Sequence, residues 1–152
     1  MITGKFPALR LRRSRKNDWS RRLIEENNLT SNDFILPIFI IDGKNKKQAI
    51  KSMPGVYRYS IDKLSTIIDK AIKNGLPMIA LFPHTKNEKK DILGSESLNE
   101  NNLVCKATQL IKKKYKNQIG IMCDVALDPY TSHGHDGLIK DGYVINDKTI
   151  EI

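Results

Sequence analysis

The hydrophobic positions of the chain change their spacing several times, and each change predicts a new element. Residues 34–41 are almost continuously apolar, with β-branched and aromatic side chains, and end at the turn signal Asp42-Gly43. Residues 78–82 and 119–125 are two further apolar runs of strand length. Because both faces of such strands are apolar, we expect interior strands of a parallel sheet or barrel.

Between these runs the apolar residues recur at helical spacing. Residues 60–75 predict an amphipathic helix in which Ser60 is placed to cap the start and Gly75 to end it. Residues 103–111 predict a second helix, and residues 146–152 the first turn of a third. Strands that alternate with helices form right-handed crossovers on a parallel sheet. The fold class is therefore α/β, either a doubly wound sheet or a (β/α)8 barrel.

The first thirty residues differ from the rest. Residues 1–16 lack hydrophobic periodicity and contain a dense run of arginines, which predicts an extended arm. Asp18 or Ser20 is placed to cap a short helix that follows the arm and continues to about Glu26. We therefore divide the chain into an arm with a short helix, residues 1–30, and the strand and helix region, residues 31–152.

Composition narrows the function classes. Lysine and arginine number 26 against 17 acids, a net charge of +9, which raises the hypothesis of nucleic-acid binding. Aromatic residues for base stacking do not accompany the charges, so we expect no nucleic-acid partner. No segment has the length of a membrane span or the pattern of a signal peptide, which predicts a cytoplasmic protein without a membrane partner. Cys105 and Cys123 have no zinc-finger spacing and are predicted to be reduced.

Ionisable side chains are concentrated in residues 123–137, directly after the third predicted strand. This loop carries three carboxylates, a serine and two histidines: Asp124, Asp128, Asp136, Ser132, His133 and His135. Loops at the carboxyl ends of strands are where α/β proteins build their sites. Because clustered acids and imidazoles alter each other's protonation, we predict that the loop is functional rather than a solvated surface loop.

The residues by themselves leave other interpretations open. The acids and histidines of the loop could hold the catalytic metal of an independent hydrolase, if three or four of them converged around an open position. The basic arm could instead make the chain a nucleic-acid-binding module. Asp128 before Pro129 is also a common turn pairing, and the histidines could be ordinary hydrogen-bonding or solvated residues.

Five segments of the chain, in this order, resemble the porphobilinogen synthase family, also called 5-aminolevulinate dehydratase. They are the arginine-rich stretch Arg10 to Arg15, Ser52-Met53-Pro54-Gly55-Val56, Leu81-Phe82-Pro83, Gly94-Ser95-Glu96, and Asp124 to Gly137. The resemblance implies the amino-terminal part of a (β/α)8 TIM barrel, preceded by an extended arm that embraces a neighbouring subunit in a homo-octamer. Residues 31–152 would hold the first three strands, so the barrel is expected to be incomplete in this chain.

The resemblance also implies a reaction. The family are lyases that condense two molecules of 5-aminolevulinate into porphobilinogen, with loss of two waters, in tetrapyrrole and heme biosynthesis. Their Schiff-base lysines lie on late barrel strands, and no lysine of this chain replaces them, since Lys89 and Lys90 are expected in a flexible loop. The chain ends within the last helical pattern. We therefore expect an inactive fragment.

The metal dependence follows from the same resemblance. Zinc-dependent members hold the metal with three cysteines, at positions occupied here by Ala126, Asp128 and Asp136. Zinc prefers sulfur and nitrogen, whereas carboxylates suit magnesium, so zinc is not expected and magnesium is, with its ligands outside this chain. The implied catalytic set is Asp124, Asp128, Asp136 and Ser132. The acids would hold the second substrate's amine and transfer protons, while Ser132 supports the loop together with the two histidines.

Overall fold

The computed structural model describes residues 4–10 and 12–152. The chain divides into two compact units, the first up to Thr30 and the second Ser31–Ile152. The first unit contains the short helix α1 (Asp18–Leu23). The predicted helix is present, but it ends at Leu23 rather than near Glu26. The N–H of Ile24 closes the last turn on the carbonyl oxygens of Ser20 and Arg21.

In the second unit, five strands form one sheet in the order β2-β3-β1-β4-β5. The three predicted strands are β1 (Ile35–Ile41), β4 (Met78–His84) and β5 (Gly120–Cys123), and they run parallel to each other, as expected. Two strands were not predicted, β2 (Lys47–Ala49) and β3 (Tyr57–Tyr59). β3 pairs parallel with β1, and β2 pairs antiparallel with β3. Three-residue strands are too short to give a recognisable period, which is why sequence analysis did not find them.

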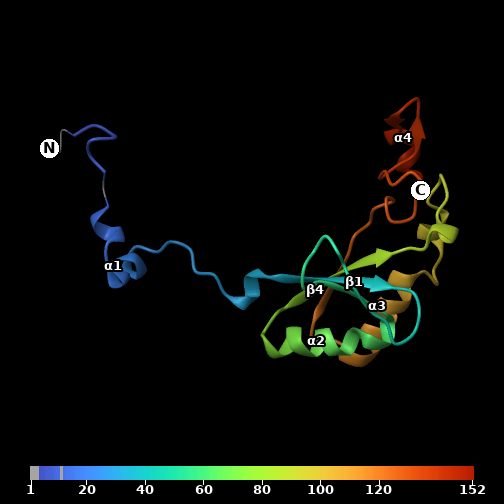
Figure 1. Cartoon of the computed structure of the whole chain (residues 1–152), viewed down its shortest axis with the longest axis horizontal. Coiled ribbons are helices and arrows are strands. Elements are labelled where there is room, and N and C mark those ends of the chain that lie inside the picture. The colour runs from blue at the N-terminus through green and yellow to red at the C-terminus, as the bar shows by residue number, and fades with distance from the viewer. Residues whose placement is uncertain (1–3, 11) are drawn as a thin grey trace. The chain divides into compact units, whose positions relative to one another are not determined.

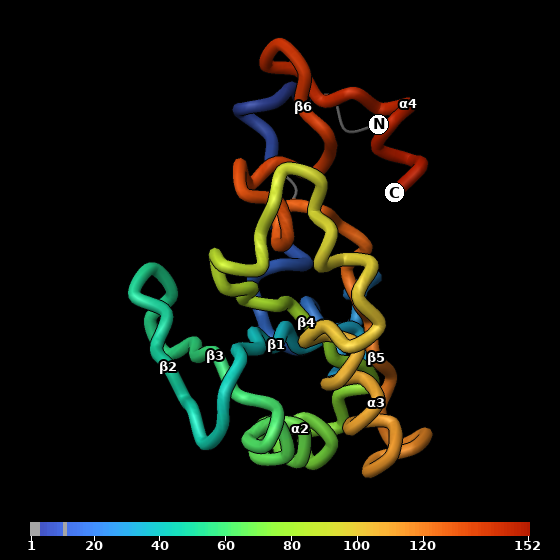
Figure 2. The backbone as a smooth tube through the Cα atoms, turned by 90° about the vertical axis from the view of Figure 1, so that its right-hand side faces the viewer, coloured from blue at the N-terminus to red at the C-terminus, as the bar shows by residue number. Residues whose placement is uncertain are grey.

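Two helices, α2 (Leu64–Lys73) and α3 (Leu103–Tyr115), cover one face of the sheet. Figures 1 and 2 show both helices on the same side of the strands. Alternate residues of the strands point to this side, and Ile38 and Ile40 are almost completely buried. They pack in one core with Leu64 and Ile68 of α2 and with residues of α3. Within Ser31–Ile152, all of which the structure describes, no helix of this length covers the opposite face.

The ends of the helices differ in how well they were predicted. Gly75 has a positive φ of 72°, and Leu76 N–H bonds to the carbonyl oxygen of Ala71, so the chain leaves α2 through the expected glycine stop. The predicted side-chain cap by Ser60 is wrong. Its hydroxyl instead accepts a hydrogen bond from the Lys46 N–H at 2.8 Å, which connects the start of this helix to the β1–β2 loop.

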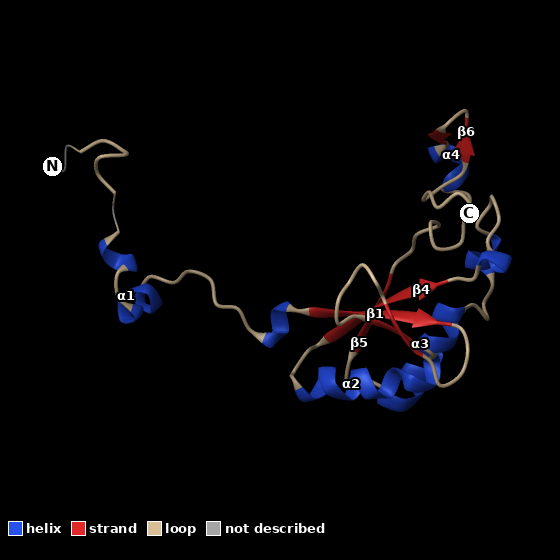
Figure 3. Cartoon of the chain, in the orientation of Figure 1, coloured by secondary structure: helices blue, strands red, loops and turns tan. Residues whose placement is uncertain are grey.

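The chain continues beyond β5 into a long loop and a small hairpin. The hairpin consists of β6 (Ile139–Lys140) and β7 (Tyr143–Val144), joined at Asp141-Gly142, where both residues have positive φ, as a tight hairpin turn requires. The short helix α4 (Asn146–Thr149) follows, as predicted. Figure 3 shows these elements beside the C-terminus. Short 3-10 turns complete the structure at Arg13–Arg15, Ser31–Asp33, Ile61–Lys63, Asn87–Lys89 and Ser95–Leu98.

Candidate functional site

The loop predicted to be functional leaves the carboxyl end of β5 and is hydrogen-bonded to the loop that leaves β4. Asp91 and Thr131 form an isolated parallel β-bridge. Ser132 N–H donates to the carbonyl oxygen of Asp91 at 2.8 Å, and Asp91 N–H donates to that of Tyr130 at 3.3 Å. The two loops therefore form one surface at the carboxyl edge of the sheet.

The β5 loop also has internal supports. The Thr131 side chain is fully buried, and its hydroxyl donates to the carbonyl oxygen of His135 at 2.8 Å. The Nδ1 of His133 accepts from the N–H of His135 at 3.2 Å, and its Nε2 lies 3.3 Å from the carbonyl oxygen of Ile92. Ser132 enters this network through its backbone, and its side chain is exposed. The histidines therefore shape the loop and connect it to the β4 loop.

Asp124 and Asp136 both lie within electrostatic reach of Asp128. Partial burial raises the pKa of Asp128 above its ordinary value, and the negative charges of Asp136 and Asp124 raise that pKa further. Asp136 accepts a hydrogen bond from the Leu127 N–H at 2.5 Å, which holds the two ends of the loop together. A carboxyl group with a raised pKa keeps its proton closer to neutral pH, so Asp128 is suited to proton transfer.

A cavity of about 650 Å³ lies beside these acids. Asp124 and Asp136 line it from the β5 loop, and Cys105 and Ser97 line it from α3 and the turn before it. The hydroxyl oxygen of Ser97 is buried and has no hydrogen-bond partner among the described residues. Tyr130, which also lines the cavity, has its phenol pKa raised to about 12, first by burial and then by the nearby Cys105, Glu96 and Cys123. Cys123, in a strand that was expected to be interior, is exposed.

Sequence analysis missed an ion-pair network beside the site. Lys89 Nζ lies 3.0 Å from Glu96 Oε1 and 3.6 Å from Asp42 Oδ2. These contacts join the β4 loop to the end of β1. Two hydrogen bonds lower the pKa of Glu96. The bond from Asn99 has the larger effect, and the bond from Lys89 adds to it. A lysine and a glutamate seven positions apart outside a helix give no sequence signal of pairing.

The described residues contain no cluster of side chains suited to bind a metal ion. Among residues 4–10 and 12–152, no three His, Cys, Asp or Glu side chains are arranged so that they could hold a metal ion. The independent metal-dependent hydrolase therefore gains no support from the arrangement of the loop. Ala126, Asp128 and Asp136 of the β5 loop offer zinc no sulfur ligand.

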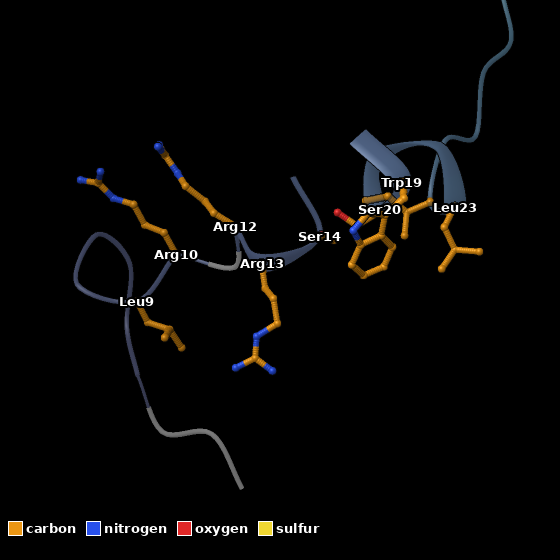
Figure 4. Close-up of a pocket in the computed structure, with 9 residues that line it drawn as sticks. Leu9, Arg10, Arg12, Arg13, Ser14, Trp19, Ser20 and Leu23 are labelled. Carbon is orange, nitrogen blue, oxygen red and sulfur yellow. The ribbon is translucent and has the colours of Figure 1, made fainter. Parts of the chain in front are cut away.

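The amino-terminal unit has a hollow of its own, of about 630 Å³, lined by arginines together with apolar residues such as Trp19 and Leu23. In Figure 4, Arg10 and Arg12 extend to one side of the backbone and Arg13 to the other. The guanidinium groups of these three arginines therefore do not converge on one anion. Asp18 pairs with Arg21 at 3.4 Å and with Arg22 at 3.0 Å.

The fold and this site define an α/β protein with an acidic, hydrogen-bonded loop at the carboxyl ends of parallel strands. Residues 8–152 match the family model of delta-aminolevulinic acid dehydratase, so the chain belongs to that family. A relative with this name from Bradyrhizobium diazoefficiens is 53% identical over 145 residues, which is 95% of this chain and 41% of the relative. One from Chlamydia pneumoniae is 41% identical over 94% of this chain and 43% of its own length. The chain thus spans about two fifths of these relatives.

A solved structure supports the same assignment. The delta-aminolevulinic acid dehydratase (porphobilinogen synthase) of Toxoplasma gondii, crystallised with its reaction product porphobilinogen, matches with a TM-score of 0.86 and 35% identity. The match covers 94% of this chain and 41% of that chain. The parallel sheet with its two helices corresponds to part of that TIM barrel, so the predicted fold class is confirmed. No helix in the described part of the chain has the length and apolar character needed to cross a membrane.

Proposed function

We propose that this chain supplies the acidic side of the active site of a porphobilinogen synthase, a lyase that condenses two 5-aminolevulinate molecules into porphobilinogen and two waters. The observation that supports this most directly is the cluster around Asp128. In a member of this family, a carboxyl group whose pKa is raised by burial and by Asp136 and Asp124 lies where the parallel strands end. Loss of two waters requires repeated proton transfer, which such a group performs.

The three acids have different roles in this proposal. Asp124 is exposed and lines the cavity, so its carboxylate attracts the ammonium group of the second substrate. Asp128 holds and releases the proton. The Oδ1 of Asp136 accepts the hydrogen bond from the Leu127 N–H, and the negative charge of Asp136 raises the pKa of Asp128. The exposed hydroxyl of Ser132 is available for a hydrogen bond to substrate.

The cofactor, assembly and location form part of the same proposal. Oxygen ligands replace sulfur at two of the former zinc positions, Asp128 and Asp136, which favours a magnesium-dependent enzyme over a zinc-dependent one. Its magnesium ligands would lie outside these 152 residues.

The family resemblance supports a homo-octamer. Both cysteines are free, which fits a cytoplasmic location, where thiols stay reduced.

The amine nucleophiles would also come from outside these residues. Lys89 is ion-paired to Glu96, and that pairing raises the pKa of its ammonium group, which is the opposite of what a nucleophilic amine requires. We therefore propose that the 152-residue polypeptide alone forms no porphobilinogen.

A chimaera tests the function directly. Residues 8–152 would replace the matching segment of the Bradyrhizobium diazoefficiens relative, and porphobilinogen formation from 5-aminolevulinate and magnesium would be followed. We expect the chimaera to be active and Asp128→Asn to lower its kcat about 100- to 10,000-fold. Glu100→Gln, an exposed acid outside the loop, is the matched control and should leave kcat unchanged. A folded chimaera without activity, or one indifferent to Asp128→Asn, would contradict the proposal.

A further inference from the structure

A small groove of about 230 Å³ lies between α2 and the edge of the sheet that β2 and β3 form (Figure 2). Three lysines, a threonine and two less polar residues line it: Lys47, Tyr59, Lys63, Thr66, Ile67 and Lys70. The first two are paired in the β2–β3 register, so their side chains share one face of the sheet. The other four recur at spacings of three and four, which places them on one side of α2 and of the turn before it.

Two contacts fix the walls of this groove. Tyr59 and Ile67 are half-buried and pack against the core cluster. The ammonium group of Lys47 lies over the ring of Tyr57, 4.1 Å from the ring centroid, and 6.0 Å from the centroid of Tyr59. Attraction to the ring faces restrains the ammonium group but leaves N–H donors free for other partners. Lys47 therefore holds a defined position beside the groove.

The lysines of the groove have no carboxylate partner. Within residues 4–10 and 12–152, Lys47, Lys63 and Lys70 form no ion pair with an aspartate or a glutamate. Three positive charges around one groove repel each other, and an anion bound between them would offset that repulsion. The groove is therefore suited to an anion that comes from outside the chain.

The two acids closest in sequence to these lysines are hydrogen-bonded elsewhere. Asp62 accepts a backbone N–H of the β1–β2 loop at 2.9 Å, and Asp69 accepts the hydroxyl of Tyr115 at 2.7 Å. The hydrogen bond with Ser60 has the largest effect in lowering the pKa of Asp62, and the charge of Lys63 has the smallest. Neither acid therefore replaces an external anion as the partner of the groove.

The donors around the groove favour a phosphate group. Ammonium groups bind phosphate oxygens as point charges, whereas a flat carboxylate is matched best by the fork of an arginine, and no arginine lines this groove. The exposed hydroxyl of Thr66 adds a neutral donor. At about 30 Å³ for each water molecule, the groove has room for a phosphate group with a few waters, and too little for a whole nucleotide.

We propose that this groove binds a phosphate group, either free inorganic phosphate or the phosphate of a small phosphorylated compound. Lys47, Lys63 and Lys70 supply the positive charges, and Thr66 supplies a hydroxyl donor. The groove lies at the β2 edge of the sheet, whereas the acids of the candidate active site follow β5 at the opposite edge. The inference is therefore independent of the proposed function, and its test requires no catalysis.

Nuclear magnetic resonance titration of the 152-residue chain tests the proposal, with inorganic phosphate as the first probe and glycerol phosphate as the second. We expect saturable shifts of amides in β2, β3 and α2, and tighter binding of phosphate than of acetate at equal ionic strength. Lys63→Gln and Lys70→Gln should each weaken phosphate binding about tenfold. Lys112→Gln, on the exposed side of α3, removes the same charge elsewhere and should leave the Kd unchanged. The tighter of the two probes identifies the source of the phosphate group.

Three results would overturn the inference. They are shifts that do not saturate, acetate binding as tight as phosphate, and a loss of affinity in Lys112→Gln as large as that in Lys70→Gln, since each indicates only general attraction of anions. Thermal unfolding gives a second measurement, because a ligand that binds only the folded chain raises its Tm. Phosphate should raise the Tm of the wild type by several degrees and that of the Lys63→Gln, Lys70→Gln double variant much less. An equal rise in both proteins would also contradict the proposal.

Discussion

At the scale of single residues, the protonation of Asp128 depends first on its partial burial and then on its two acidic neighbours. The side chain remains largely exposed, yet Asp136 and Asp124 both act to keep its proton bound. Because the pKa is raised in the folded chain, the folded state binds the proton more tightly than the unfolded state does. The free energy of unfolding therefore falls as the pH rises from the ordinary aspartate pKa through the raised pKa of Asp128. The proton-transfer role of the loop thus costs a small amount of folding stability.

We predict that Asp136→Asn lowers the pKa of Asp128 toward the ordinary aspartate value, since it removes a negative charge that opposes ionisation of Asp128. Asp124→Asn should lower that pKa by a smaller amount. Carbon-13 titration of the Asp128 carboxyl group measures both changes directly. Glu100→Gln is the matched control. A titration curve that is the same in all four proteins would show that the acids do not interact.

The acids of the site could be predicted because they are close in sequence. Asp124, Asp128 and Asp136 leave one strand in one short loop, so an apolar run followed by clustered acids was enough to find them. Residues that hold this loop from elsewhere could not be found in the same way. Asp91 is forty positions from Thr131, and nothing in either segment indicates that the two form a bridge. Lys47 lies in a strand too short to be recognised, so neither its face nor its neighbours could be inferred.

At the scale of elements, the β4 loop acts as a support for the β5 loop. The Oδ1 of Asp91 accepts hydrogen bonds from the N–H groups of Leu93 at 2.9 Å and Ser95 at 3.0 Å, which closes a tight turn. Its backbone carbonyl oxygen then receives the N–H of Ser132. Hydrogen bonds to the Asp91 carboxylate lower its pKa, and the bond from Ser95 has the largest effect. The stabilisation that the turn gains from these bonds is therefore complete above the ordinary aspartate pKa, and it is lost as the pH falls through the lowered pKa of Asp91.

We predict that Asp91→Ala opens the turn and speeds amide hydrogen exchange at Ser95 and Ser132 about tenfold, while amides of β1 and β4 keep their protection. Asp91→Asn retains an oxygen acceptor and should restore most of the protection. Exchange measured by nuclear magnetic resonance at pH 6 distinguishes the two variants. Equal exchange at Ser132 in the wild type and in Asp91→Ala would show that the turn does not support the β5 loop.

Long elements could be predicted and the two- and three-residue strands could not, for a physical reason. β1, β4, α2 and α3 bury enough apolar side chains for their period to appear in the sequence. β2, β3 and the strands of the β6–β7 hairpin are two or three residues long. β2 and the hairpin are mostly exposed and β3 is half-buried, so none of them shows a periodic pattern of buried side chains. The Ser60 cap failed for a related reason. The Ser60 hydroxyl accepts a hydrogen bond from Lys46, 14 residues earlier, and capping rules consider only residues within the same helical turn.

At the scale of the whole molecule, the buried apolar core belongs to one unit. Every member of the core cluster, from Ile38 to Ile119, lies within Ser31–Ile152, and Tyr115 of α3 donates a hydrogen bond to Asp69 of α2 at 2.7 Å across the helix layer. Among residues 4–10 and 12–30 of the first unit, the buried residue is the polar Ser20, while Trp19 and Leu23 are exposed. We therefore propose the division at residue 30 as a division in stability as well.

Removal of residues 1–30 should consequently leave the thermal unfolding of the second unit almost unchanged, because the deletion takes away no member of the core. We expect a shift in Tm within about 2 °C, which for a domain of this size corresponds to well under 1 kcal/mol. Circular dichroism of the full chain and of residues 31–152 makes the comparison, with Ile40→Ala as the positive control. Ile40 is fully buried, so its truncation should cost about 2–5 kcal/mol and lower Tm by several degrees. If the deletion destabilised the second unit as much as Ile40→Ala, the arm would be part of the folded unit, and its arginines would have to be counted among the residues that support the site.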